Sequence, residues 1–307
     1  MVQTPADTLN SPQSDQGFSL TEALIAVAML LVLFSSAIPA LQQTTKVSRV
    51  VGDTSAMHGS VRGATELLQQ EIGQAGRVSL PGPVTLAGTV AIGPATVSLS
   101  SATGLFVGAH VVVGTGDNAE TVTLTAVAAP TITALFKLDH VVGEPVQIRG
   151  GFSGGIVPPS MTNGSTGNVL KLFGDINDDG SLVYVEYICD LTKGKLYRNM
   201  MAWDAGAKPA VTESMALLNN IIANPGGAPC FTYQAQTVLT TTFITGVAVT
   251  LSVRSQQKDL YSGDFLRATK TLLNVSPRNI FLVWTMASIG NTNRIQPIPP
   301  SILTLLP

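Results

Sequence analysis

The sequence is poor in charged residues, cysteine and histidine. Charged residues make up 12% of its 307 residues, with 17 basic against 19 acidic side chains, so we expect no basic surface for nucleic acid. Its three histidines, His58, His110 and His140, share no motif. No Gly-x-Ser-x-Gly, His-Glu-x-x-His or phosphate-loop pattern occurs. We therefore expect no enzyme, and we interpret the pair Asp139–His140 as ordinary surface residues.

The first 17 residues lack Lys and Arg and contain Asp7 and Asp15. A secretory signal begins with basic residues and ends its apolar core at a small-residue cleavage site, and this segment has neither in good form. An apolar run follows over 18–41, interrupted by Glu22. About 20 such residues are enough to span a bilayer as a helix. A carboxylate inside the run costs roughly 2.5–3.5 kcal/mol on insertion scales, so we expect a specific partner for it.

Gly17, followed at once by Phe18 and then by Glu22 as the fifth residue after the glycine, resembles the class III signal of type IV prepilins and pseudopilins. Pro39 lies where pilin helices carry a kinking proline. The resemblance implies that a prepilin peptidase cuts between Gly17 and Phe18 and methylates the Phe18 amine. It also implies assembly roles for Glu22 and Pro39, with the Glu22 carboxylate meeting the Phe18 amine of a neighbouring subunit and setting the axial register. The alternative is an acid that reaches the membrane interface without a partner.

The apolar spacing predicts one long helix over 18–76, with a transmembrane part at 18–41 and an amphipathic stem at 42–76. Small or apolar residues recur three or four positions apart along the stem: Val47, Val50, Val51, Met57, Val61, Ala64, Leu67, Leu68, Ile72 and Ala75. Glycines within it weaken the helix by about 1 kcal/mol each relative to Ala. A helix that is apolar first and amphipathic afterwards is typical of a membrane anchor that docks onto a folded head.

Three further segments resemble the PilW-type minor pilins, which are related to the J-type pseudopilins of type II secretion. They are ELLQQEIGQAGR at 66–77, the turn and strands at 173–198, and NVSPRN at 274–279. The resemblance implies an α+β fold, in which the long N-terminal helix packs on an antiparallel pilin-type β-sheet. Residues 161–285 would form this sheet.

Short Val/Thr-rich runs separated by Gly and Pro fill residues 77–160. They predict an inserted all-β domain, either a small sandwich or a barrel. Within the head we expect a helix near Glu213–Ala223, ended by Asn224-Pro225-Gly226-Gly227. The Pro-rich tail, 286–307, is expected to be irregular.

Asp175, Asn177, Asp179 and Glu186, with Gly180 at the sixth position, match the spacing of a twelve-residue calcium loop. Calcium is therefore a candidate ligand, and no other cofactor is expected. The flanking segments are predicted strands, and Asp, Asn and Gly also favour plain hairpin turns. A turn without metal is the alternative.

The two cysteines, Cys189 and Cys230, suit one disulfide in an exported chain. Closing a loop of about 40 residues stabilises a fold by roughly 3–4 kcal/mol in the chain-entropy model. The alternative is two buried, unpaired thiols.

These expectations indicate a minor pilin that takes part in assembling a type IV pilus. The implied location is the inner membrane, crossed once with the head in the periplasm, and afterwards the pilus. The implied partners are other pilins or pseudopilins, the prepilin peptidase, the inner-membrane assembly platform and membrane lipid. Two alternatives stay open: a pseudopilin of a type II secretion system, which neighbouring genes would identify, and a membrane-anchored adhesin that binds through 77–160.

Overall fold

The computed structural model describes residues 17, 19–259 and 262–307. They form two compact units, one up to Gly52 and one from Asp53 to Pro307. The helix α1, Leu20–Gln74, runs through the boundary without interruption. The predicted helix is therefore present, and its bounds agree with the expectation to within two residues.

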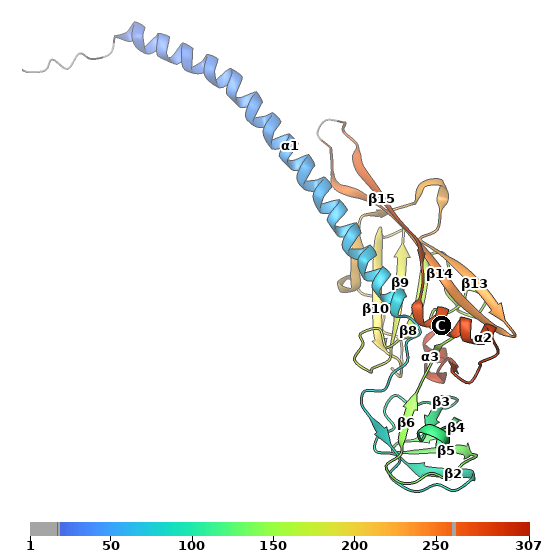
Figure 1. Cartoon of the computed structure of the whole chain (residues 1–307). Coiled ribbons are helices and arrows are strands. Elements are labelled where there is room, and N and C mark those ends of the chain that lie inside the picture. The colour runs from blue at the N-terminus through green and yellow to red at the C-terminus, as the bar shows by residue number, and fades with distance from the viewer. Residues whose placement is uncertain (1–16, 18, 260–261) are drawn as a thin grey trace, which may run out of the picture. The chain divides into compact units, whose positions relative to one another are not determined.

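The second unit begins with the last turns of α1, which pack on the head (Figure 1). The side chains that face the head are buried and share one core with the head strands: Met57, Val61, Ala64, Leu68 and Ile72. These are the positions that the three-and-four spacing predicts. Earlier stem positions such as Val47 and Val51 are exposed.

The head is built from antiparallel strands. One four-stranded sheet has the order β11-β10-β9-β8, from β8 (Val169–Gly174), β9 (Val183–Asp190), β10 (Lys195–Ala202) and β11 (Ala216–Asn219). In the other sheet, the order is β12-β14-β13, and β15 also pairs with β14. Its strands are β12 (Ile221–Ile222), β13 (Phe231–Val238), β14 (Thr241–Lys258) and β15 (Phe265–Val275). Residues of both sheets join α1 in a single hydrophobic core. The chain is thus an α+β protein.

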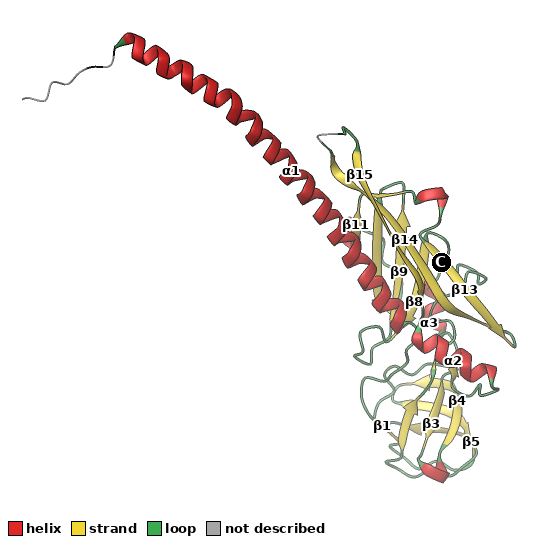
Figure 2. Cartoon of the chain, turned by 45° about the horizontal axis from the view of Figure 1, so that its top comes forward, coloured by secondary structure: helices red, strands yellow, loops and turns green. Residues whose placement is uncertain are grey.

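The inserted segment forms a sheet of six strands in the order β1-β6-β3-β4-β5-β2. Figure 2 labels β1, β3, β4 and β5 of this sheet. They are β1 (Val84–Thr85), β2 (Gly93–Ser98), β3 (His110–Val113), β4 (Glu120–Ala128), β5 (Thr131–Phe136) and β6 (Pro145–Ile148). The edge strands also meet, because Leu86 bridges to Leu99 and Ala87 N–H donates to the Ser98 carbonyl at 2.8 Å. These bonds close the sheet, so of the two predicted shapes the inserted segment has that of a barrel.

The prediction of a helix near Glu213–Ala223 is wrong. Only a short 3-10 turn, Glu213–Met215, is present, and the next residues form β11 and β12. Asn220 separates these two strands with φ of 58°, a conformation that Asn tolerates better than most residues. The pairing of β11 with β10 and of β12 with β14 outweighs the helical pattern of the sequence.

The prediction of an irregular tail is also wrong. Helix α2 (Arg278–Ser288) takes up the end of the segment predicted as sheet and the first three residues of the tail, and it buries Ile280, Val283 and Ala287 in the head core, a spacing that fits one helix face. Strand β16 (Ile295–Gln296) then pairs with β7 (Gly151–Phe152), and α3 (Pro300–Leu305) buries Ile302 in the core that includes the barrel. Non-local packing orders this Pro-rich stretch.

Candidate functional site

The first half of α1 is an uncovered apolar surface. Its best 18-residue window has a mean hydropathy of 2.5, and none of that window is buried. Large side chains such as Leu24, Met29 and Phe34 are each more than half exposed. By length and composition this is one helix near the N-terminus that is able to cross a membrane.

Glu22 lies in the first turn of this helix and takes part in its cap. Ser19 Oγ accepts the Glu22 N–H at 3.2 Å, and the Glu22 carboxylate accepts the Ser19 N–H at 3.4 Å. This reciprocal arrangement is a capping box. The sequence signal for it is Ser-x-x-Glu before an apolar run, and the predictions made from the sequence did not include this cap. Gly17 is exposed, whereas Phe18 and the leader residues 1–16 lie outside the described residues.

Pro39 lies inside α1, and the helix continues on both sides of it. Proline has no N–H for the intrahelical ladder, so one carbonyl of the preceding turn loses its helical donor. Ser35 and Ser36 are in that turn, and their hydroxyls donate to the carbonyls of Val32 and Leu33 at 2.7 and 2.9 Å. The helix therefore passes through the predicted kink position as one element.

The stem is tied to the head by a buried ionic contact. Glu71, only 3% exposed, accepts hydrogen bonds from Arg198 of β10: Oε1 from Nε at 3.0 Å and from Nη2 at 2.5 Å, and Oε2 from Nε at 3.3 Å. It also accepts the Tyr187 hydroxyl of β9 at 2.6 Å. Burial, together with the negative charge of Glu71, raises the pKa of Tyr187. A carboxylate on the helix is thus held by two neighbouring strands.

The three segments that resemble minor pilins meet where α1 ends. Gly76 N–H donates to the Phe173 carbonyl at 2.9 Å, and Asp175 N–H donates to the Arg77 carbonyl at 3.0 Å. The Asn279 side chain donates to the Gln74 carbonyl at 3.1 Å. One junction thus joins the end of the stem to the start of the hairpin between β8 and β9 and to the first turn of α2.

Glycines let the backbones approach closely at this junction. Gly76 has φ of 79°, and a Cβ added to Gly155 would lie 2.2 Å from the Gly76 Cα. Only residues without a Cβ allow that approach.

No family model, no curated protein and no solved structure matches the chain.

The predicted calcium ligands are divided between the turn and the strand after it. Asp175 accepts the N–H groups of Asp179 and Gly180 at 3.0 and 3.2 Å, and Arg77 lies 3.7 Å from it. Glu186 lies in β9, directly opposite Lys171 of β8. That pair is three residues along the ladder from Gly174–Val183, about 10 Å at 3.4 Å per residue.

The Glu186 carboxylate has partners of its own. Lys208 Nζ lies 2.7 Å from it, Lys171 Nζ lies 3.5 Å away, and the Tyr184 hydroxyl donates to it at 2.6 Å. Asn177 lies in the turn. Within the described ranges, no three His, Cys, Asp or Glu residues gather as a metal site. Calcium binding stays a prediction, which calorimetric titration of the full chain with CaCl₂ would check.

The two cysteines are joined. Cys189 of β9 and Cys230, the residue before β13, form a disulfide with a Cα–Cα distance of 6.5 Å. Both residues are buried in the head core. Since β9 and β13 belong to different sheets, the bond links the two sheets of the head covalently.

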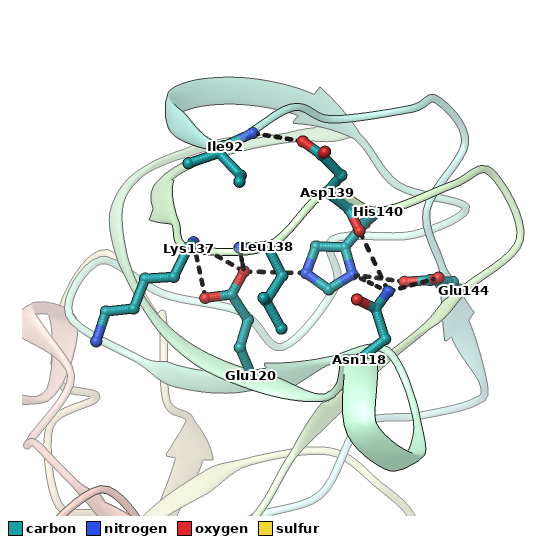
Figure 3. Close-up of polar contacts among 8 residues, drawn as sticks. All are labelled: Ile92, Asn118, Glu120, Lys137, Leu138, Asp139, His140 and Glu144. Atoms are coloured by element: carbon teal, nitrogen blue, oxygen red, sulfur yellow. Dashed lines mark hydrogen bonds and ion pairs between the residues drawn. The ribbon is translucent and has the colours of Figure 1, made fainter.

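His140 lies at the centre of a polar cluster inside the barrel, so its interpretation as a surface residue is wrong (Figure 3). Its ring is completely buried, with Nδ1 2.5 Å from Glu144 Oε2 and Nε2 3.0 Å from Glu120 Oε1. Asn118 Nδ2 donates to Glu144 at 3.1 Å. The residues come from two short segments about 20 positions apart and share no known motif, so the pairing of the strands between them is what brings the cluster together.

Proposed function

We propose that this chain is a minor pilin, a membrane-anchored structural subunit that is cleaved after Gly17, N-methylated at Phe18 and incorporated into a type IV pilus. The observation that carries the proposal is helix α1. Its first half is apolar and uncovered, and its second half contributes Met57, Leu68 and Ile72 to the head core. A subunit built in this way has an anchor continuous with its folded head.

The described contacts support a partner for Glu22 outside its own chain. Its cap bond to Ser19 N–H is long, at 3.4 Å, and both residues are exposed. A charged amine makes a shorter and stronger hydrogen bond to a carboxylate than a neutral N–H does. Pairing with the Phe18 amine of a neighbouring subunit removes the cost of an isolated charge in apolar surroundings. Only one axial offset between helices brings the two groups together.

The proposal includes location and partners. The subunit sits in the inner membrane with its head in the periplasm before it enters the pilus. Its helix then packs beside the helices of other pilins, after the peptidase and the inner-membrane platform have acted on it. The exposed apolar face of α1 suits first lipid and later the helices of a filament, because both surroundings are nonpolar.

Two matched variants test the role of Glu22. Glu22→Gln removes the charge but keeps the capping box, since Gln at this position also reaches back to the cap residue. Ser19→Ala removes the capping hydroxyl but keeps the charge. We expect Glu22→Gln to reach the membrane normally while its amount in sheared pili falls by at least about tenfold, as a lost buried ion pair implies. Ser19→Ala should be incorporated nearly as well as the unaltered chain.

Quantitative mass spectrometry of pili and membranes measures both variants, and it also identifies the amino terminus. Undiminished incorporation of Glu22→Gln would contradict the pairing. A loss in Ser19→Ala as large as that in Glu22→Gln would contradict a specific role of the Glu22 charge, because Ser19→Ala keeps that charge. A membrane-extracted protein that still begins at Met1 would contradict the proposed function as a whole.

A further inference from the structure

Three basic side chains gather around Phe265 at the hairpin of β14 and β15. Arg254 and Arg267 are directly opposite each other in the strand register. The Arg254 guanidinium lies 4.6 Å from the centroid of the Phe265 ring, and Lys258 Nζ lies 5.9 Å from it. Arg267 follows Phe265 by two positions and so points to the same face of β15. We call these four residues the basic patch.

The charges of the basic patch are not neutralised by acids. All three cations are exposed, and in the part of the chain that the structure describes none of them forms an ion pair. Asp264 lines the same hollow as Arg254 and Arg267, and Asp259 Oδ2 accepts the Ser262 N–H at 3.0 Å. Like charges directly opposite each other in a sheet are destabilising. An anion that covers the patch removes this repulsion.

The basic patch lies at the end of the head from which the stem emerges. Val275, the last residue of β15, lines a hollow with Gln74 at the end of α1. Residues 253–256 of β14 line another hollow, with Asp53 and Ala56. Between these points β15 runs along the stem (Figure 1). The hairpin therefore points in the direction in which the stem leaves the head.

The apolar run lies close to this end of the head along the chain. It ends at residue 41, twelve helical residues before Asp53, which correspond to about 18 Å. From Arg254, β14 continues in the same direction to Lys258, about 13 Å farther. The headgroup layer on each side of a bilayer is itself about 5–7 Å thick. When the apolar run spans a bilayer, the headgroups are thus within reach of the basic patch.

We propose that the basic patch binds the anionic headgroups of the membrane that holds the apolar run, and so keeps the head at the bilayer surface until the subunit is assembled. The inference rests on the membrane anchor of the proposed function. Each Lys or Arg near an anionic surface strengthens the attraction roughly fivefold. Three such charges give a contact that holds the head and still releases it. The position of the patch favours lipid over nucleic acid, because its own anchor carries it to the bilayer.

Fluorescence quenching of the full chain in nanodiscs tests the contact. In Phe265→Trp an indole replaces the ring under Arg254, and lipids with a nitroxide on the headgroup quench it only at close range. Nanodiscs of phosphatidylcholine are compared with nanodiscs that also contain phosphatidylglycerol, and the unaltered chain supplies the background of its own tryptophans. We expect stronger quenching with phosphatidylglycerol. It should decline as salt shortens the Debye length from about 10 Å at 0.1 M to about 3 Å at 1 M.

Two double variants, made in the Phe265→Trp chain, separate the patch from charge in general. Arg254→Gln/Arg267→Gln removes the opposed pair, and the ratio of quenched to unquenched emission with phosphatidylglycerol should fall roughly 25-fold, or roughly fivefold for each charge. Lys137→Gln/Arg149→Gln removes two exposed charges of the barrel and should leave the ratio unchanged. Because all four side chains are exposed, both variants should keep the Tm of the parent chain.

The outcomes distinguish this proposal from the proposed function. A chain that does not enter nanodiscs contradicts the anchor, and with it both proposals. A chain that enters them but shows equal quenching with and without phosphatidylglycerol, or no effect of Arg254→Gln/Arg267→Gln, overturns the basic patch alone. Displacement of the patch from the anionic nanodisc by inorganic phosphate or by duplex DNA, at matched ionic strength, would also overturn it, in favour of a small anion or of nucleic acid.

Discussion

Removing the carboxylate that ties the stem to the head should destabilise the head strongly. In Glu71→Ala the Tyr187 hydroxyl, on a fully buried residue, loses its partner, and Arg198 keeps a charge whose side chain is 22% exposed. An unpaired buried hydroxyl costs about 1–3 kcal/mol, and the partly exposed arginine adds less than a fully buried charge would. We expect a loss of about 3 kcal/mol, or about 6–12 °C in Tm for a domain of this size.

Thermal unfolding of the full chain in mild detergent measures this loss. The fluorescence of Trp284, which packs against the head core, follows the transition. Arg62→Ala is the matched control on the same helix, because its pair with Glu66 is 78% and 62% exposed and such pairs contribute little. Equal Tm values for Glu71→Ala and the control would refute the role of Glu71 in docking the stem.

Two further predictions concern the close approach of Gly155 to Gly76 at the end of the stem and the buried Tyr187. Gly155→Ala places a Cβ 2.2 Å from the Gly76 Cα and should lower Tm. Gly206→Ala, whose Cβ would meet no atom within 4 Å, should leave Tm unchanged. Equal Tm values for the two variants would contradict the close approach. Because the pKa of Tyr187 is raised by burial and by Glu71, its contribution to stability is complete below about pH 10 and is lost as pH rises further. Absorbance of ionised tyrosine should therefore rise together with unfolding, and a rise that precedes the loss of fluorescence would speak against this coupling.

Local patterns predicted most of the elements because they reflect which face of each element is buried. Most of the runs that became β2 to β6 alternate because one side faces a core, whereas β8 and β9 are buried on both faces and were recognisable as apolar runs. The stem residues from Met57 to Ile72 were identifiable for the same reason. Of the candidate site, sequence patterns pointed to Glu22, to Pro39 and to the pairing of the two cysteines.

The predictions that failed concern residues whose conformation or burial depends on contacts with other parts of the chain. The segment Ala216–Ile222 has a helical pattern, but β10 and β14 offer it open sheet edges. His140 is followed by two exposed valines, so it resembles a loop residue until β4 brings Glu120 beside it. In the same way, Gln296 is fully buried and bonds main-chain groups of His110 and Arg149, which lie 186 and 147 positions earlier in the chain. No local pattern encodes these contacts.

The bridge between Arg77 and Gly151 brings together the two points at which the chain enters and leaves the barrel. Bridged residues in antiparallel strands lie only about 5 Å apart, so a domain of another size or fold can be spliced between them without stretching the backbone on either side. Such an exchange would also have to replace the core that the barrel shares with Phe173 and Tyr184 of the head strands and with Ile302 of α3.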